Sequence, residues 1–452
     1  MKLDTKNRFI AAASVCILIP AMLLGQPAGK KGLTGVWEVK LSPVGQSPTL
    51  SLAMFGGDGS FTMAGGNKAL PSIPALQAVA NELGPAFGQW TPTGAREFSL
   101  TSYAVMQKAG LGNGFQRVQY TLVLSESGDE YTGHAEVDFL DADWNVVFST
   151  TGDMKGARLE TPATVLAQLP GKKQLLGVWE ENLSPLGQSE SRLLSLAMFD
   201  RDGSFTTTGG YKALPPVLAV EDIATELGPG YGQWGATDNA REFRLAYYSV
   251  MWKAGLVNGF QRVRCTLALS ESGDEYTGHA QVDFLDAKWK IVFSTTRDVK
   301  GTRLEIPAGL VAQPGERNGV WEVKFQRLGV SPPPPLLGLI LFREDGSFSA
   351  DVPRHAPPIP AIQAVGNELG PIYGRVVQTD GAYRTVFYLY SVMWKAGQVN
   401  GFLRTLSNQV LSESDNEWAR RAQVDFFDAN WTVVFSMTGE MKATRLETPG
   451  QD

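Results

Sequence analysis

Histidine and acidic residues are considered first, because a histidine beside a carboxylate can act as a general base. His134 shares one face of an expected β-strand with Glu136 and Asp138. Residues two apart on a strand are separated by about 6.6 Å, so His134 could touch Glu136, whereas Asp138 lies about 13 Å away. Related segments of the chain place His279 and Arg421 at this position. Because the histidine–acid pair is not kept, we expect a solvent-facing polar strand and assign no catalytic residue.

No other motif indicates a metal, cofactor or nucleophile site. The chain has 3 His and 2 Cys without metal-ligand spacing, and it lacks a glycine-rich phosphate loop and a Gly-x-Ser-x-Gly elbow. Asp58, Asp202 and Asp345 precede glycines as hairpin formers, without the other ligand positions of a calcium loop. Cys265 alternates with apolar residues and is expected in a core. We therefore predict no metal and no cofactor.

Aromatic residues are stronger candidates for ligand contact. Tyrosines recur on the fifth strand of each repeat described below, and tryptophans recur at related positions on the fourth or fifth strand, with Val376 and Gln107 as the exceptions. Such residues can line an apolar cavity or its mouth, with a short helix as a lid, and ordinary packing in a core or at a barrel end is the alternative. The candidate ligand-binding residues are Trp90, Tyr103, Trp234, Tyr248, Trp252, Tyr390 and Trp394.

These positions recur because the chain contains one unit three times. The motif Gly-Val-Trp-Glu begins at residues 35, 177 and 319, so its tryptophans are 142 residues apart (179 − 37 and 321 − 179). Solenoid and propeller repeats are about 20–50 residues long, so this period corresponds to a whole domain. We predict three tandem domains at residues 33–160, 175–305 and 318–447, joined by short linkers that contain Pro and Gly.

Within a unit the pattern is β with one helical insert. Asp58-Gly59 between apolar runs indicates a hairpin. Apolar residues at helical spacing over residues 73–83, followed by Gly84-Pro85, predict a short helix with a stop signal. The strands expected in the first unit are residues 36–41, 50–55, 61–64, 88–91, 96–106, 115–125, 131–140 and 146–159. We predict an all-β fold of three tandem eight-stranded antiparallel up-and-down barrels, each with the helix between strands three and four.

A tryptophan on the first strand and an arginine on the last strand of an eight-stranded meander resemble the lipocalin, or calycin, pattern. In that family the tryptophan packs against the arginine and closes the base of the barrel. The resemblance implies three such pairs, which are Trp37 with Arg158, Trp179 with Arg303 and Trp321 with Arg445. An arginine over an indole is a cation–π contact worth about 0.5–2 kcal/mol. The sequence departs from the family in the helical insert, in having no disulfide framework and in having no long helix after the last strand.

Composition and the N-terminal segment suggest where the protein works. The 452 residues contain 40 Lys and Arg against 46 Asp and Glu, without a dense basic run, so a nucleic-acid partner is not expected. Basic residues followed by an apolar stretch of about 16 residues predict a signal peptide over residues 1–28, with a membrane anchor as the alternative. After cleavage no stable membrane span is expected, and the predicted location is secreted or periplasmic.

Three hypotheses about function follow. The first is a secreted non-enzymatic binding protein, in which each barrel holds a small apolar ligand or presents loops to a protein partner. The second is a lipocalin-like barrel enzyme, such as an isomerase, cyclase or hydrolase. The third is a structural tandem-repeat protein with filled barrels. Because the sequence lacks a persistent acid–base pair, the binding hypothesis is preferred.

Overall fold

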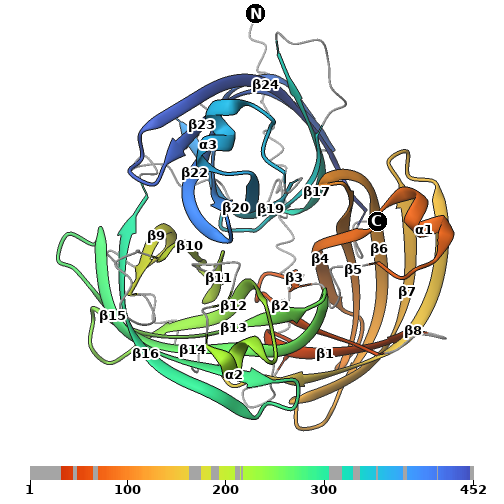
Figure 1. Cartoon of the computed structure of the whole chain (residues 1–452). Coiled ribbons are helices and arrows are strands. Elements are labelled where there is room, and N and C mark those ends of the chain that lie inside the picture. The colour runs from red at the N-terminus through yellow and green to blue at the C-terminus, as the bar shows by residue number, and fades with distance from the viewer. Residues whose placement is uncertain are drawn as a thin grey trace, which may run out of the picture.

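The computed structural model describes residues 32–43, 48–64, 70–161, 175–184, 193–208, 214, 217–304, 318–328, 336–352, 355–379, 384–414 and 416–447. The predicted signal peptide, residues 1–28, lies outside the described residues. Three closed antiparallel barrels of eight strands each are present, which confirms the predicted fold class (Figure 1). In the part of the chain that the structure describes, no helix is long and apolar enough to cross a membrane.

Consecutive strands pair antiparallel in every barrel, and the first strand also pairs with the last, so each sheet closes on itself. The first barrel comprises β1 (Gly35–Pro43), β2 (Thr49–Phe55), β3 (Ser60–Ala64), α1 (Pro74–Val79), β4 (Glu82–Pro92), β5 (Glu97–Lys108), β6 (Leu111–Leu124), β7 (Glu130–Asp141) and β8 (Val146–Arg158).

The second and third barrels repeat this order of elements. The second comprises β9 (Gly177–Leu183), β10 (Leu193–Phe199), β11 (Ser204–Thr207), α2 (Leu218–Glu221), β12 (Glu226–Ala236), β13 (Glu242–Lys253), β14 (Leu256–Leu269), β15 (Glu275–Asp286) and β16 (Ile291–Arg303). The third comprises β17 (Gly319–Arg327), β18 (Leu336–Phe342), β19 (Ser347–Asp351), α3 (Pro360–Val365), β20 (Glu368–Thr379), β21 (Arg384–Lys395), β22 (Gln398–Glu413), β23 (Glu417–Asp428) and β24 (Val433–Arg445).

The helical insert is shorter than its apolar spacing predicts. Leu76 on α1 is buried against the barrel core, as a helix with one apolar face requires. The predicted stop signal, Gly84-Pro85, instead lies inside β4, where the pairing with β5 shifts register between Leu83 and Ala86. A proline has no N–H to donate to a sheet ladder, and the irregularity in the pairing accommodates it. The helix therefore ends earlier and the fourth strand begins earlier than predicted.

Each barrel base is closed by an arginine that lies over a tryptophan of the same barrel. Trp37 pairs in register with Arg158, and the guanidinium carbon lies 4.2 Å from the centroid of the indole ring. The corresponding distances are 4.2 Å for Arg303 over Trp179 and 5.0 Å for Arg445 over Trp321. Arg158 also donates to the backbone carbonyls of Gly32, Thr34 and Gly128, so its charge is compensated as it enters the base. The contact implied by the lipocalin resemblance is thus present in all three units.

The three barrels pack side by side in a ring (Figure 1). The outer face of β1 and β2 packs on β12–β14 of the second barrel, β9 and β10 pack on β20–β22 of the third, and β17 and β18 pack on β4–β6 of the first. Each barrel thus uses one face toward one neighbour and a different face toward the other. Such head-to-tail contacts form a ring when the rotation closes, and here three units close it. The units are related by an approximate threefold axis.

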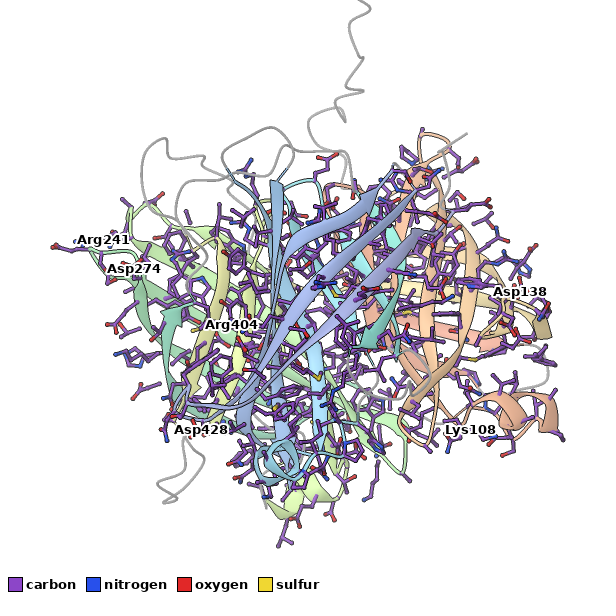
Figure 2. All side chains as sticks on the ribbon, turned by 90° about the horizontal axis from the view of Figure 1, so that it is seen from above. Lys108, Asp138, Arg241, Asp274, Arg404 and Asp428 are labelled. Carbon is purple, nitrogen blue, oxygen red and sulfur yellow. The ribbon has the colours of Figure 1, made fainter. Side chains whose placement is uncertain are left out.

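Apolar side chains fill the three interfaces. The interface between the first and second barrels contains Val36, Leu52, Met54, Tyr248, Val250 and Phe260. Equivalent clusters join the second barrel to the third and the third to the first. Charged side chains such as Asp138 and Arg241 lie at the margins of the molecule (Figure 2). The assembly therefore buries apolar residues on the outer barrel faces as well as in the barrel interiors.

A tryptophan in the last hairpin of each barrel joins it to a neighbour. Trp144 between β7 and β8 has a φ of 66°, a backbone conformation that a bulky residue rarely adopts. Its ring stacks on Phe115 at 4.6 Å between centroids, and its indole N–H donates to Glu322 Oε2 of the third barrel at 3.2 Å. The equivalent bonds run from Trp289 to Glu38 and from Trp431 to Glu180. The last residue of each Gly-Val-Trp-Glu motif therefore accepts a bond from a neighbouring barrel.

The turns between the second and third strands of the three barrels contact one another near the approximate axis. The backbone N–H of Gly57 donates to Asp202 Oδ2 at 2.9 Å, and that of Arg201 donates to Asp345 Oδ2 at 3.2 Å. One position of the turn differs in all three units, being Gly56, Asp200 or Arg343. Asp200 and Arg343 are buried, with 3.7 Å between Asp200 Oδ2 and Arg343 Nε, so the two groups face each other where three aspartates or three arginines would repel.

Candidate functional site

The tyrosines predicted to contact a ligand lie between barrels. Tyr103 on β5 packs against the third barrel, and its hydroxyl donates to the carbonyl of Glu447 at 2.8 Å. Tyr248 on β13 packs against the first barrel and donates to the carbonyl of Glu160 at 2.7 Å. Tyr390 on β21 packs in the corresponding contact with the second barrel. In this structure the three tyrosines join neighbouring barrels.

The tryptophans predicted to contact a ligand fall into two groups. Trp90 and Trp234 pack against barrel cores. Their indole N–H groups donate to the carbonyls of Gly56 and Asp200, in the turn between the second and third strands, at 3.2 and 3.1 Å. Trp252 and Trp394 line a cavity between the barrels, which is treated below. The predicted set is therefore distributed over barrel ends, barrel interfaces and one cavity.

The histidines on the seventh strand of the first two barrels face solvent. His134 Nδ1 lies 3.2 Å from Asp153 Oδ1 on the neighbouring strand, so its partner is this residue and not Glu136. The equivalent pairs are His279–Asp298 at 2.6 Å and Arg421–Glu440 at 3.9 Å. These are cross-strand pairs on an exposed face, which contribute little to stability.

The second barrel holds a carboxylate inside its core. Glu181 lies on the inner face of β9 and is 4% exposed. It accepts hydrogen bonds from the hydroxyls of Tyr276 at 2.5 Å and Ser195 at 3.0 Å. Burial raises the pKa of Glu181, and the hydrogen bonds from Tyr276, Ser195 and Thr207 oppose that shift. The barrel therefore contains a carboxyl group that is protonated more readily than an exposed one.

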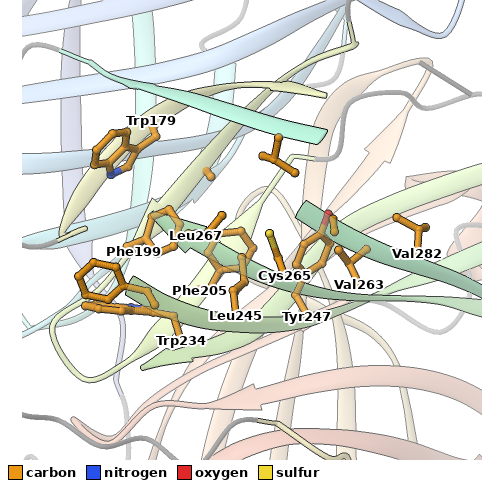
Figure 3. Close-up of a cluster of buried hydrophobic side chains, with 14 of the residues drawn as sticks. Trp179, Phe199, Phe205, Trp234, Leu245, Tyr247, Val263, Cys265, Leu267 and Val282 are labelled. Carbon is orange, nitrogen blue, oxygen red and sulfur yellow. The ribbon is translucent and has the colours of Figure 1, made fainter. Parts of the chain in front are cut away.

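A cavity of about 30 Å³ adjoins this carboxyl group. Figure 3 shows part of its surroundings, with Cys265 and Tyr247 among aliphatic and aromatic side chains. The lining residues are Glu181, Leu183, Leu227, Leu245, Tyr247, Gln261, Val263, Cys265, Leu267, Ala280, Val282, Arg297 and Val299. The volume corresponds to about two water molecules.

Arg297 lines the same cavity from β16 and is 5% exposed. Gly301 of β16 pairs with Glu181, and Arg297 lies four residues earlier, about 13 Å along the strand. The two residues therefore start from different levels of the barrel wall, and both side chains line the one cavity. Gln261 and Cys265, both on β14, add an amide and a thiol. Burial raises the pKa of Cys265, and the nearby Glu181 adds to the shift, so the thiol stays protonated at neutral pH.

The two ends of this barrel are covered differently. At one end Arg303 lies over Trp179, as described above. At the other end Val220 of α2 and the neighbouring Ile223 pack into the core cluster.

Comparison of the three units shows that the fold does not need these polar groups. Glu181 is replaced by Val39 in the first barrel and Val323 in the third, both of which belong to barrel cores. Arg297 is replaced by glycine at residues 152 and 439. Sequence reasoning missed Glu181 and Arg297, although a change confined to one copy of the repeat was the signal that could have found them. Cys265 is in the core, as predicted.

The third barrel carries a different buried charge. Arg420 of β23 is fully buried, and its guanidinium carbon lies 4.3 Å from the centroid of the Phe387 ring. Burial lowers the pKa of Arg420 to about 10, so it remains charged at neutral pH. The first two barrels have glycine at this position, Gly133 and Gly278. The interiors of the three barrels are therefore not chemically equivalent.

No family model and no curated protein matches the chain. Three matching solved structures are a protein of unknown function from the DUF3598 family of Nostoc punctiforme (10% identity, TM-score 0.17, 60% of this chain and 96% of that one), a bacterial polysaccharide outer membrane secretin (7%, 0.19, 91% and 98%) and an endo-1,5-α-L-arabinanase from Thermotoga petrophila (10%, 0.15, 92% and 100%). At these TM-scores the matches bear on neither fold nor function.

Proposed function

We propose that the protein is a non-enzymatic binding protein and that its second barrel holds a small ligand. One observation carries the proposal: two charged residues, Glu181 and Arg297, line the cavity of this barrel at positions that are valine or glycine in its sister barrels. Burying a polar or charged group costs free energy unless it is fully compensated. Because two sister barrels close without Glu181 and Arg297, these residues serve a purpose other than barrel formation.

The lining suggests the chemistry of the ligand. Leu245, Val263 and Val282 offer apolar contact, whereas Gln261 and Arg297 offer hydrogen-bond donors. A small, largely apolar molecule with one acceptor or acidic group matches this combination. Because the cavity volume is only about 30 Å³, binding requires side chains or α2 to move outward.

Replacing Glu181 by Val and Arg297 by Gly together tests the proposal. These are the residues of the sister barrels, so the variant is expected to fold. Native mass spectrometry of the full chain, purified from its own host, should show a retained molecule that the double variant lacks. His279→Gln, an exposed change on the same barrel, is the matched control and should retain it. A double variant that retains the molecule as well as the original protein does would contradict the proposed site.

An enzyme built on the same cavity is the second candidate. The raised pKa of Glu181, caused by burial, favours it, because a carboxyl group that holds its proton more readily than an exposed one is better suited to act as a general acid. Turnover of the retained molecule by the purified protein, lost in Glu181→Gln, would support this candidate over simple binding. Release of the molecule unchanged from the original protein would support binding.

We also propose that the protein is exported and works outside the cytoplasm. The basic and apolar pattern of residues 1–28 supports this location. Fusing these residues to a reporter enzyme that is active only after export tests the proposal. A fusion that remains in the cytoplasm, while a known signal peptide exports the same reporter, would contradict it.

A further inference from the structure

A second cavity lies where the three barrels meet, apart from the cavity inside the second barrel. Its volume is about 60 Å³. The Leu-Gly-Pro segments at the start of the fourth strand of each barrel contribute equivalent residues to it. The lining residues are Ala64, Leu83, Gly84, Pro85, Thr208, Leu227, Gly228, Pro229, Trp252, Asp351, Glu368, Leu369, Gly370, Pro371 and Trp394. We call it the axial cavity.

Two aromatic rings and one carboxylate occupy equivalent places around the axial cavity. The ring of Trp252 packs over Gly228, and the ring of Trp394 packs over Gly370. Over Gly84 of the first barrel lies the carboxylate of Asp351, and a Cβ added to Gly84 would stand 2.1 Å from its Oδ2 atom. The glycine therefore makes room for a carboxylate that comes from the third barrel.

The first barrel differs at the position where its sisters carry tryptophan. Gln107 pairs in register with Glu82, as Trp252 pairs with Glu226 and Trp394 with Glu368. Gln107 is fully buried, and among the described residues neither atom of its amide group has a hydrogen-bond partner. Gln107 itself does not line the axial cavity, so the first barrel contributes no aromatic ring to the described lining where its sisters contribute tryptophan.

We propose that the axial cavity binds a small organic cation, namely a primary or methylated amine. Indole rings and carboxylates together are the groups that recognise such cations. Asp351 and Glu368 bring two carboxyl groups to the described lining beside the two indole rings. The volume of about 60 Å³ suits a molecule of a few heavy atoms and is well below the roughly 150 Å³ that holds benzene.

The composition of the lining argues against other ligands. An anion would meet two carboxylates without a basic residue in the described lining. Within the described residues no group of three or more His, Cys, Asp or Glu side chains is placed to hold a metal ion. An organic cation uses the aromatic rings as well as the carboxylates, which a metal ion or an anion does not.

Calorimetric titration of the full chain with methylammonium and trimethylammonium tests the proposal, with tert-butanol as a neutral molecule of similar shape to the latter. Saturable binding of at least one cation, and weaker binding of tert-butanol, is expected. Asp351→Asn should weaken cation binding at least tenfold, because the carboxylate is neutralised. Gln107→Trp introduces the residue of the sister barrels, whose ring would compete with the Asp351 carboxylate for the place over Gly84, and should abolish binding.

Glu136→Gln is the matched control, since it removes one exposed carboxylate from the same molecule and should not change binding. Thermal melting of each variant checks that it folds. If Asp351→Asn does not fold, the comparison of trimethylammonium with tert-butanol on the unmodified protein decides the matter. Equal binding of these two probes, or no saturable binding of either cation, would overturn the proposal.

Discussion

At the scale of single residues, the arginines at the barrel bases concentrate several interactions on one side chain. Arg158 lies over Trp37 and also donates to backbone carbonyls from two separate loops. The arginine therefore acts as a common partner for both ends of the barrel sequence, which explains why each unit ends with this residue on its last strand.

Arg158→Met is expected to lower the free energy of unfolding of the first barrel by about 2–4 kcal/mol, because a cation–π contact and several buried hydrogen bonds are lost together. Urea denaturation followed by tryptophan fluorescence measures the change. Arg96→Met is the control, since Arg96 makes a 3.7 Å ion pair with Glu126 on an exposed surface and should matter by less than about 1 kcal/mol. Equal effects of the two substitutions would show that the base does not depend on Arg158.

The buried Asp200 at the axis predicts a pH-dependent stability. Burial raises the pKa of Asp200 from 3.8 to about 7, although Arg343 opposes the shift. The folded state then holds a proton that the unfolded chain releases, so this contribution is full below about pH 4 and is lost as the pH rises through 7. Asp200→Asn should flatten the decrease in melting temperature over this range. An unchanged pH profile would mean that Asp200 is ionised throughout.

At the scale of elements, the last hairpin of each barrel holds a tryptophan in a strained backbone conformation, and that tryptophan contacts a neighbouring barrel. Trp289 holds a φ of 64°, stacks on Phe260 at 4.4 Å and donates to Glu38 of the first barrel. Strain of this kind persists when surrounding contacts over-determine the conformation. The repeated hairpin sequence thus has a role that only the neighbouring barrel reveals.

Trp289→Phe keeps much of the ring stacking but removes the donor to Glu38, which is 7% exposed. We expect a loss of about 1–3 kcal/mol, because a buried carboxylate loses a donor while Lys40, at 3.2 Å, remains. Hydrogen exchange should increase along β1 and β2, at the interface, more than in the interior of the second barrel. An equal increase in exchange in both regions would show that the substitution does not act through the interface.

At the scale of the whole molecule, the ring makes each barrel dependent on its neighbours. A single barrel would expose both of its apolar interface faces, including Tyr103 and Val105 in the first barrel. Large exposed apolar patches lead to association. A single unit therefore carries the two complementary faces that a symmetric trimer needs.

Residues 33–160, 175–305 and 318–447 produced separately should behave differently from one another. A trimer of the first unit would place three copies of Gly56 near the axis, whereas the second and third units would place three copies of Asp200 or Arg343 there. We expect the first unit to form trimers and the third to remain less associated at neutral pH, because three arginines repel. The second unit should associate less as the pH rises above the pKa of Asp200 and its carboxyl groups ionise. Light scattering after size-exclusion chromatography measures this. Monomeric behaviour of the first unit would show that the linkers are essential.

Much of the fold was predictable because its signals are local. Alternation of polar and apolar residues identified the strands, and Asp-Gly pairs identified the hairpins between the second and third strands. The 142-residue period identified the three units. The Trp37–Arg158 pairing was also foreseeable, since strand order and closure bring the first and last strands together. The fourth strand was predicted too short because Gly84-Pro85 stops a helix as readily as it bends a strand.

The contacts between barrels and the lining of the cavities were decided by the tertiary structure alone. On β13 an almost unbroken run of buried residues has one face toward the barrel interior and the other toward the first barrel, so Tyr248 joins barrels. A single strand cannot reveal what covers its outer face, and His134 meets Asp153 only because of the strand register. The sequence by itself determined the elements and their repetition. Which outer faces meet, and which polar side chains share a cavity, depends on contacts between residues far apart in the chain.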